Sequence, residues 1–239
     1  MLRDEIKKYR QPDLLVSPKE NPEKDSTGNG ILYSSLYYLA LYFRGELIGD
    51  DVAEFRRVIE SCEIRNQPGF FKRSPTKEND QTGKDDYYGV LACCYLFGLT
   101  HISTRIYEAG ACIRWFPFKW IYDIEEPGTF KINGWFGRFA EWTCVVKSAS
   151  RKAWPNIFDE IKYSVHILTQ VLFSKDDTTC WILSYLNSLS VRPVEGFFSA
   201  IAHELLDAAI KRRGGMPKLL ELHLGADHPI AKHWPRDKQ

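Results

Sequence analysis

The chain has 239 residues, of which 44% are hydrophobic, and 32 Lys and Arg stand against 31 Asp and Glu. These globular values exclude wholesale disorder, and a formal net charge of +1 argues against a binder of nucleic acid. No run approaches the roughly 18 uninterrupted apolar residues of a membrane span, and the start of the chain lacks the apolar core of a signal peptide. We therefore expect a protein that is cytoplasmic as synthesised and binds neither membranes nor nucleic acid.

Helical periodicity accounts for most of the chain. Residues 31–44 are apolar nearly all round, which is typical of a helix buried on most sides. Residues 50–60 place apolar side chains every three or four positions and charged ones between them, as in a surface helix. The alternation of apolar and more mixed helical segments then continues over 86–97, 101–115, 134–147, 154–173, 178–190 and 196–212.

One of these segments, 154–173, is a long amphipathic pattern. Its apolar positions are Ile157, Ile161, Val165, Leu168 and Leu172. A buried helix followed by a more exposed one, repeated along the chain, is the pattern of stacked helical hairpins with an inner and an outer layer. We expect an all-α fold of helical hairpins in an open or closed (α/α) toroid over residues 30–224. Residues 1–29 would form an extended N-terminal arm, and residues 225–239 a polar C-terminal tail.

Metal and disulfide chemistry have little support in the sequence. The six cysteines include no Cys-x-x-Cys spacing, and most lie in apolar runs, where free Cys behaves as a small hydrophobe. His203 and Glu204 begin like a zinc-binding helix, but Asp207 stands where the second histidine would be needed. We expect reduced, buried thiols, no metal site and no cofactor.

Polar and aromatic residues gather before the expected inner helices. They are clearest at residues 28–33, Gly-Asn-Gly-Ile-Leu-Tyr, and 84–90, Lys-Asp-Asp-Tyr-Tyr-Gly-Val. This arrangement resembles the (α/α) toroids of glycoside hydrolases and polysaccharide lyases, and the second run is similar to the Asp-Asp helix entrance of some uronic-acid-releasing hydrolases. Similar compact helical chains also occur among phage-encoded proteins. The resemblance implies a glycan-binding or glycan-hydrolysing protein whose cleft lies at the inner-helix entrances.

Asp86 and Glu141 are the two carboxylates that a hydrolase of this kind would use. Asp86 follows Asp85 at a predicted helix start, where exposed amides lower a carboxyl pKa and suit a base or nucleophile. The other interpretation, which the position favours, is an N-cap followed by a first-turn acid. Glu141 lies in an apolar segment beside Arg138, either as general acid or in a buried ion pair. The expected substrate-binding residues are Asn29, Tyr33, Asp85, Tyr88, Trp135 and Arg138.

The alternative is a non-enzymatic structural or adaptor protein, for example a phage virion component. Its contacts with a protein partner would be the N-terminal arm and the Pro-bounded loop that holds Phe70 and Phe71, since paired phenylalanines are costly to leave exposed. Packing of that loop onto its own domain is the other interpretation. Helix entrances filled by tyrosine and tryptophan side chains would favour the non-enzymatic alternative.

Overall fold

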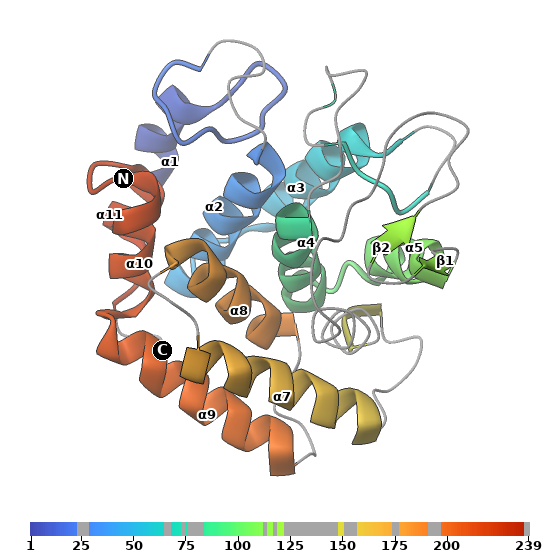
Figure 1. Ribbon diagram of the computed structural model, residues 1–239. Helices are drawn as coiled ribbons and strands as arrows, with labels where there is room; N and C mark the ends of the chain where they lie inside the picture. The colour runs from blue at the N-terminus through green and yellow to red at the C-terminus, as the bar shows by residue number, and fades with distance from the viewer. Residues whose placement is uncertain are drawn as a thin grey trace.

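The computed structural model describes residues 1–22, 29–64, 68–72, 75, 84–111, 114–116, 119–121, 148–150, 157–173, 177–190 and 197–236. Within these ranges the protein is mostly helical, which confirms the all-α class (Figure 1). The elements in chain order are α1 (Leu2–Glu5), the 3₁₀ helix η1 (Ile6–Tyr9), α2 (Gly30–Arg44), α3 (Gly49–Cys62), α4 (Lys84–Phe97), α5 (Thr100–Ala111), β1 (Arg114–Phe116), β2 (Lys119–Ile121), α7 (Ile157–Phe173), α8 (Thr178–Ser190), α9 (Phe197–Arg212), α10 (Gly215–Leu224) and α11 (Pro229–His233).

The two short strands are a departure from the helix expected over 101–115. α5 ends at Ala111, and β1 then pairs antiparallel with β2. Pro117 follows β1 and disfavours helical backbone at Phe116, the residue before it.

The centre of the fold consists of α2, α4 and α8. α4 packs against both α2 and α8. Every residue of α2 from Gly30 to Leu41 is buried, as its nearly all-round apolar pattern predicts. α3 lies against α2 and α5 against α4, while α7 and α9 pack against each other at the edge of the molecule (Figure 1).

Small side chains let α2 and α4 approach closely. A Cβ added at Gly89 of α4 would lie 2.7 Å from the Cβ of Ser35 on α2. The Ser35 hydroxyl donates back to the Ile31 carbonyl at 2.9 Å, and the Cys93 thiol donates to the Ser35 carbonyl at 3.5 Å. The polar groups at this buried crossing are thus hydrogen-bonded, and burial raises the pKa of the Cys93 thiol.

The two ends of the chain pack onto the fold, so they differ from the extended arm and polar tail expected from the sequence. Leu2, Ile6 and Leu15 are buried near the N-terminus, and Ile230 and Trp234 near the C-terminus. The short apolar runs at both ends bury their side chains against each other and α2, because α11 contacts both α1 and α2.

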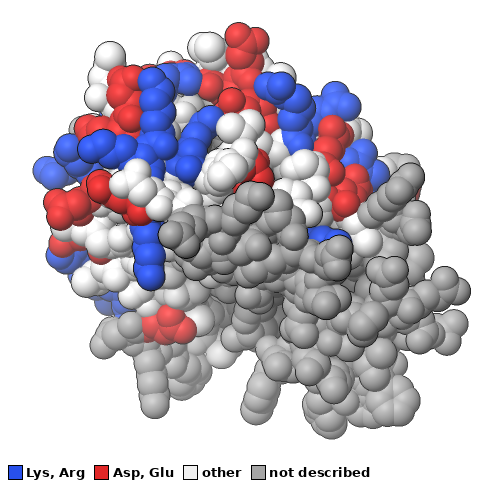
Figure 2. Space-filling model, turned by 90° about the horizontal axis from the view of Figure 1, so that it is seen from above, with Lys and Arg blue, Asp and Glu red and all other residues white. Residues whose placement is uncertain are grey.

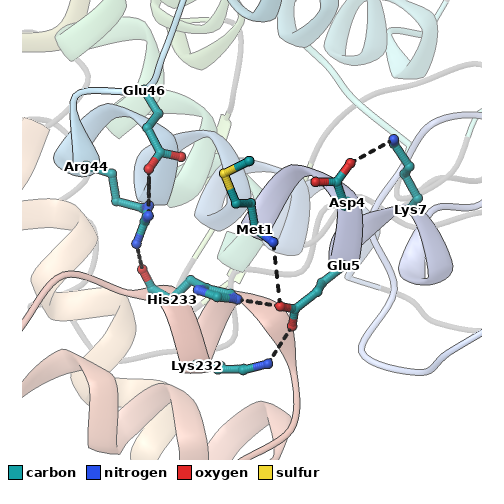
Figure 3. Close-up of polar contacts among 8 residues, drawn as sticks. All are labelled: Met1, Asp4, Glu5, Lys7, Arg44, Glu46, Lys232 and His233. Carbon is teal, nitrogen blue, oxygen red and sulfur yellow. Dashed lines mark hydrogen bonds and ion pairs between the residues drawn. The ribbon is translucent and has the colours of Figure 1, made fainter.

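A cluster of charged groups holds the two ends together (Figure 3). The Glu5 carboxylate accepts hydrogen bonds from Lys232 Nζ and His233 Nε2, both at 2.9 Å. These two hydrogen bonds lower the pKa of Glu5 to about 2. Arg44, at the end of α2, donates to the His233 carbonyl oxygen at 3.2 Å. Residues from both ends and from α2 therefore meet at one point.

His228 makes a second, buried connection between the ends. Its Nε2 lies 3.1 Å from the Ser17 carbonyl oxygen, and its Nδ1 accepts the Ile230 N–H at 3.2 Å. A neutral ring with its proton on Nε2 satisfies both bonds, so the tautomer is assigned from these partners. The ring also packs edge-on against Tyr9, with centroids 4.5 Å apart. Burial lowers the pKa of His228, which keeps it neutral at pH 7.

Candidate functional site

The described members of the predicted glycan site lie where α2 begins beside α4. Asn29 is the N-cap residue of α2, and Tyr33 follows one turn later. Asp86 and Tyr88 belong to the first turns of α4. The structure thus brings part of the predicted set together. The side chain of Asp85, and all of Trp135, Arg138 and Glu141, lie outside the described residues.

Asp86 caps the start of α2 from the neighbouring helix. Its side chain is 2% exposed, and Oδ1 accepts the backbone N–H of Leu32 at 3.1 Å. Leu32 is in the first turn of α2, where an N–H has no acceptor within its own helix. The Asn29 side chain makes no capping bond, so Asp86 supplies an acceptor, and a negative charge, at the positive end of α2. Asp86, which was expected to be catalytic, thus has a structural role at the start of α2.

The two tyrosines of the predicted site are also buried. Tyr33 is 7% exposed and Tyr88 is 6% exposed. The Tyr33 ring lies 6.0 Å from the ring of His223, on α10. Both side chains therefore fill space between helices. A tyrosine that binds a sugar ring by stacking needs an accessible face.

The loop expected to dock a partner packs onto its own domain. Phe70 is 3% exposed and Phe71 is 1% exposed, which agrees with the interpretation that this loop packs onto its own domain; contact of these residues with a protein partner stays a prediction. The Tyr87 hydroxyl holds the loop by accepting the Phe71 N–H and donating to the Gly69 carbonyl, both at 3.2 Å. Gly69 has a φ of +86°, and a Cβ there would collide with the Arg105 carbonyl oxygen. The pairing of two phenylalanines did not reveal this, because the residues that cover them are distant in sequence.

A buried hydrogen bond joins α7 and α9. Tyr163, which is fully buried, and His203, which is 8% exposed, meet with the hydroxyl 2.8 Å from Nε2. Burial lowers the pKa of His203 to about 4, so the imidazole is neutral at pH 7. His203 was singled out only for a broken metal motif, and no sequence signal pointed to Tyr163. In the part of the chain that the structure describes, no three His, Cys, Asp or Glu side chains gather as metal ligands.

The outer side of α7 and α9 is apolar and exposed. Seven large apolar side chains on the two helices are between 38% and 69% exposed: Ile157, Phe158, Val165, Leu172, Phe198, Ile201 and Leu205. We call this surface the α7/α9 face. At about 150–200 Å² per large side chain, the exposed fractions amount to on the order of 600 Å² of apolar surface. The largest apolar patch of a typical monomer is about 300–600 Å² and is often functional.

The apolar stripe of α7 points away from the core, which is the reverse of what its pattern indicates. Val165 and Leu172 are exposed, whereas Tyr163, Ser164 and Ile167 are buried. An amphipathic helix ordinarily buries its apolar stripe against its own domain. α7 instead buries a mixed face against α9, and of its most regular apolar face Val165 and Leu172 are exposed while Ile161 and Leu168 are half-buried. The helices in the described ranges include none that is long and apolar enough to cross a bilayer.

Two other surfaces offer less to a ligand. A cleft of about 490 Å³ at the turn between α9 and α10 is lined by Lys211, Lys218, Glu221 and Arg236, with glycines and a proline but no aromatic side chain on which a sugar could stack. Figure 2 shows Lys and Arg interspersed with Asp and Glu on the described part of the face seen from above. Mixed charge of this kind forms no extended electrostatic footprint for nucleic acid there.

Comparison of the chain with protein-family models, curated proteins and solved structures finds no match. Function is therefore inferred from the chain's own surfaces. Of the surfaces described above, the α7/α9 face is the one that exposes a large apolar area to solvent, which is unfavourable unless a partner covers it.

Proposed function

We propose that this chain is a non-enzymatic structural or adaptor protein that binds a protein partner through the α7/α9 face. The observation that carries the proposal is the exposure of seven large apolar side chains on two adjacent helices. Covering a patch of this size with a complementary surface gains roughly 25 cal/mol per Å² of apolar area removed from water.

The described part of the predicted glycan site supports the same proposal. Asp86 accepts a backbone N–H of α2, and a nucleophile or base must instead lie within reach of its substrate. Tyr33 and Tyr88 are buried between helices, which is the outcome expected for the non-enzymatic alternative. A toroidal arrangement of the hairpins, and a glycan cleft that uses Asp86 with Glu141, stay predictions.

A photo-crosslinking experiment in the native host tests the proposal. A photoreactive amino acid such as benzoylphenylalanine is placed at Leu172, in the α7/α9 face, and in a matched chain at Ala53, an exposed apolar residue of α3. We expect light-dependent protein adducts from position 172 and few or none from position 53. Equal yields from the two positions, or no adduct at 172, would contradict the proposal.

A glycan assay provides an independent check on the same protein. Purified chain is incubated with mixed oligosaccharides, including uronic-acid-containing ones, and reducing ends are measured. We expect no release above that of a heat-unfolded sample. Turnover that is lost in Asp86→Asn, with folding retained, would overturn the proposal in favour of the hydrolase hypothesis.

A further inference from the structure

We propose that the partner is a second copy of this chain, and that two chains join their α7/α9 faces in antiparallel orientation about a two-fold axis. The inference rests on the proposed function and names the occupant of the face. It follows from the spacing of the exposed side chains, the register of the two helices, the distribution of charge and the area available.

The spacing on both helices is that of a helix–helix interface. On α7 the stripe consists of Phe158, Ile161, Val165, Leu168 and Leu172, of which the second and fourth are half-buried and the others exposed. On α9 it consists of Phe198, Ile201, Leu205, Ala208 and Arg212, all exposed. Both stripes advance by three and four residues in turn, which is the a and d spacing of packed helices in bundles.

The register of α7 and α9 places the two stripes side by side. Only short connections link α7 to α8 and α8 to α9, so successive helices alternate in direction and α7 runs parallel to α9 (Figure 1). The bond between Tyr163 and His203 then aligns residues 40 positions apart in the sequence. Val165 lies level with Leu205 by this register, so the two stripes form one two-helix surface, which is half of a four-helix bundle.

Charge at the two ends of the face selects the antiparallel orientation. The start of α7 presents the half-buried Glu160, since Asp159 is buried, whereas the end of α9 is basic and exposed, with Lys211 and Arg212. A two-fold axis perpendicular to the helices brings the acidic end of each face to the basic end of the other. A parallel arrangement would set like charges against like, and like-charge contacts oppose association.

The size of the face matches a homodimer interface. Stable interfaces bury about 800 Å² per partner, of which about 65% is apolar in homodimers. The roughly 600 Å² of exposed apolar surface estimated above, with the polar and charged residues at its edges, falls in that range.

Sedimentation velocity on the full chain tests the inference. At about 100 µM chain, well above a micromolar dissociation constant, we expect a species of twice the 27.7 kDa chain mass. Val165→Lys introduces two facing charges near the axis and should weaken dimerisation at least 100-fold. Ala53→Lys, the matched control on α3, should leave it unchanged. Circular dichroism confirms that both variants keep the helical content of the unsubstituted chain.

Charge reversal tests the orientation. Glu160→Arg and Arg212→Glu should each raise the dissociation constant about tenfold, and the double variant should restore it, because the exchanged charges again face each other across the axis. Single variants whose effects simply add in the double variant would contradict the antiparallel orientation.

Failure of this inference is distinguishable from failure of the proposed function. A monomeric unsubstituted chain, together with adducts at Leu172 to proteins of another mass, overturns the homodimer and leaves the proposed function standing. A monomer with no adduct at Leu172 overturns both. A dimer whose dissociation constant is unchanged by Val165→Lys places the interface elsewhere and overturns the inference. A photo-adduct from position 172 with twice the mass of the chain supports the inference.

Discussion

Replacing Asp86 should destabilise the protein because this carboxylate completes the start of a different helix. Asp86→Ala leaves the buried Leu32 N–H without the acceptor that now lies 3.1 Å away. An orphaned buried donor costs about 1–3 kcal/mol, and loss of a partly buried charge at a helix N-terminus costs up to about 2 kcal/mol more. Since removing a buried carboxylate also relieves its desolvation, we expect a net loss of about 2–3 kcal/mol in the free energy of unfolding.

The conservative variant separates the hydrogen bond from the charge. Asp86→Asn keeps an oxygen that can accept the Leu32 N–H but removes the negative charge near the α2 N-terminus. It should therefore cost about 1 kcal/mol, mainly the charge–dipole contribution. If Asp86 acted only in catalysis, both substitutions would leave the free energy of unfolding unchanged.

Urea unfolding at pH 7, followed by tryptophan fluorescence, measures these changes, since Trp181 is fully buried in α8. Asp50→Ala is the matched control, because Asp50 is also a first-turn acid but is exposed on α3. It should cost less than about 1 kcal/mol. If Asp86→Ala unfolds at the same urea concentration as Asp50→Ala, with equal slopes, the capping argument is refuted.

Further predictions concern pH, packing and the chain ends. Folded His203 takes up its proton only near pH 4, against 6.5 for an ordinary histidine, so stability is full above pH 6.5 and falls as the pH drops towards 4. His203→Gln should reduce the loss in unfolding free energy between neutral pH and about pH 4.5 by about 2 kcal/mol, and an unaltered pH slope in urea titrations would rule this out. Gly89→Ala should lower the free energy of unfolding by about 1–3 kcal/mol in the same titrations, because its new Cβ collides with Ser35. Gly49→Ala is the control and should be neutral or stabilising, because no atom lies within 4 Å of a Cβ added there. Equal effects of the two substitutions would contradict the packing argument. Glu5→Gln should speed proteolytic cleavage within both ends of the chain, as measured by mass spectrometry. The difference in cleavage rate between the variant and the unsubstituted chain should shrink in high salt, which screens the ion pairs. Cleavage of the variant at the unsubstituted rate would show that this carboxylate does not hold the two ends together.

The positions of the main helices follow from the sequence because they depend on local patterns. The nearly all-round apolar run at 31–44 predicted a buried helix, and α2 occupies Gly30–Arg44. The helical segment predicted over 196–212 corresponds to α9, which occupies Phe197–Arg212. Periodicity and stop signals act within one or two turns, so a single chain segment contains the information they need.

Partners that are distant along the chain could not be found in this way. Asp86 was identified as a first-turn acid, but the N–H that it accepts belongs to a residue 54 positions away. His228 was assigned to a polar tail, although its ring bonds to the Ser17 carbonyl 211 positions away. Nothing local marks either pairing, because it arises only when separate helices pack.

α7 separates the two kinds of information most clearly. The sequence determines that this segment is an amphipathic helix, since Val165 and its apolar neighbours recur with helical spacing. Only the tertiary structure decided which face is buried: the core takes up Tyr163 and Ile167, and Val165 and Leu172 face water. The physical reason is that an apolar stripe requires burial against something, and its spacing carries no information on whether that surface belongs to the same chain or to another.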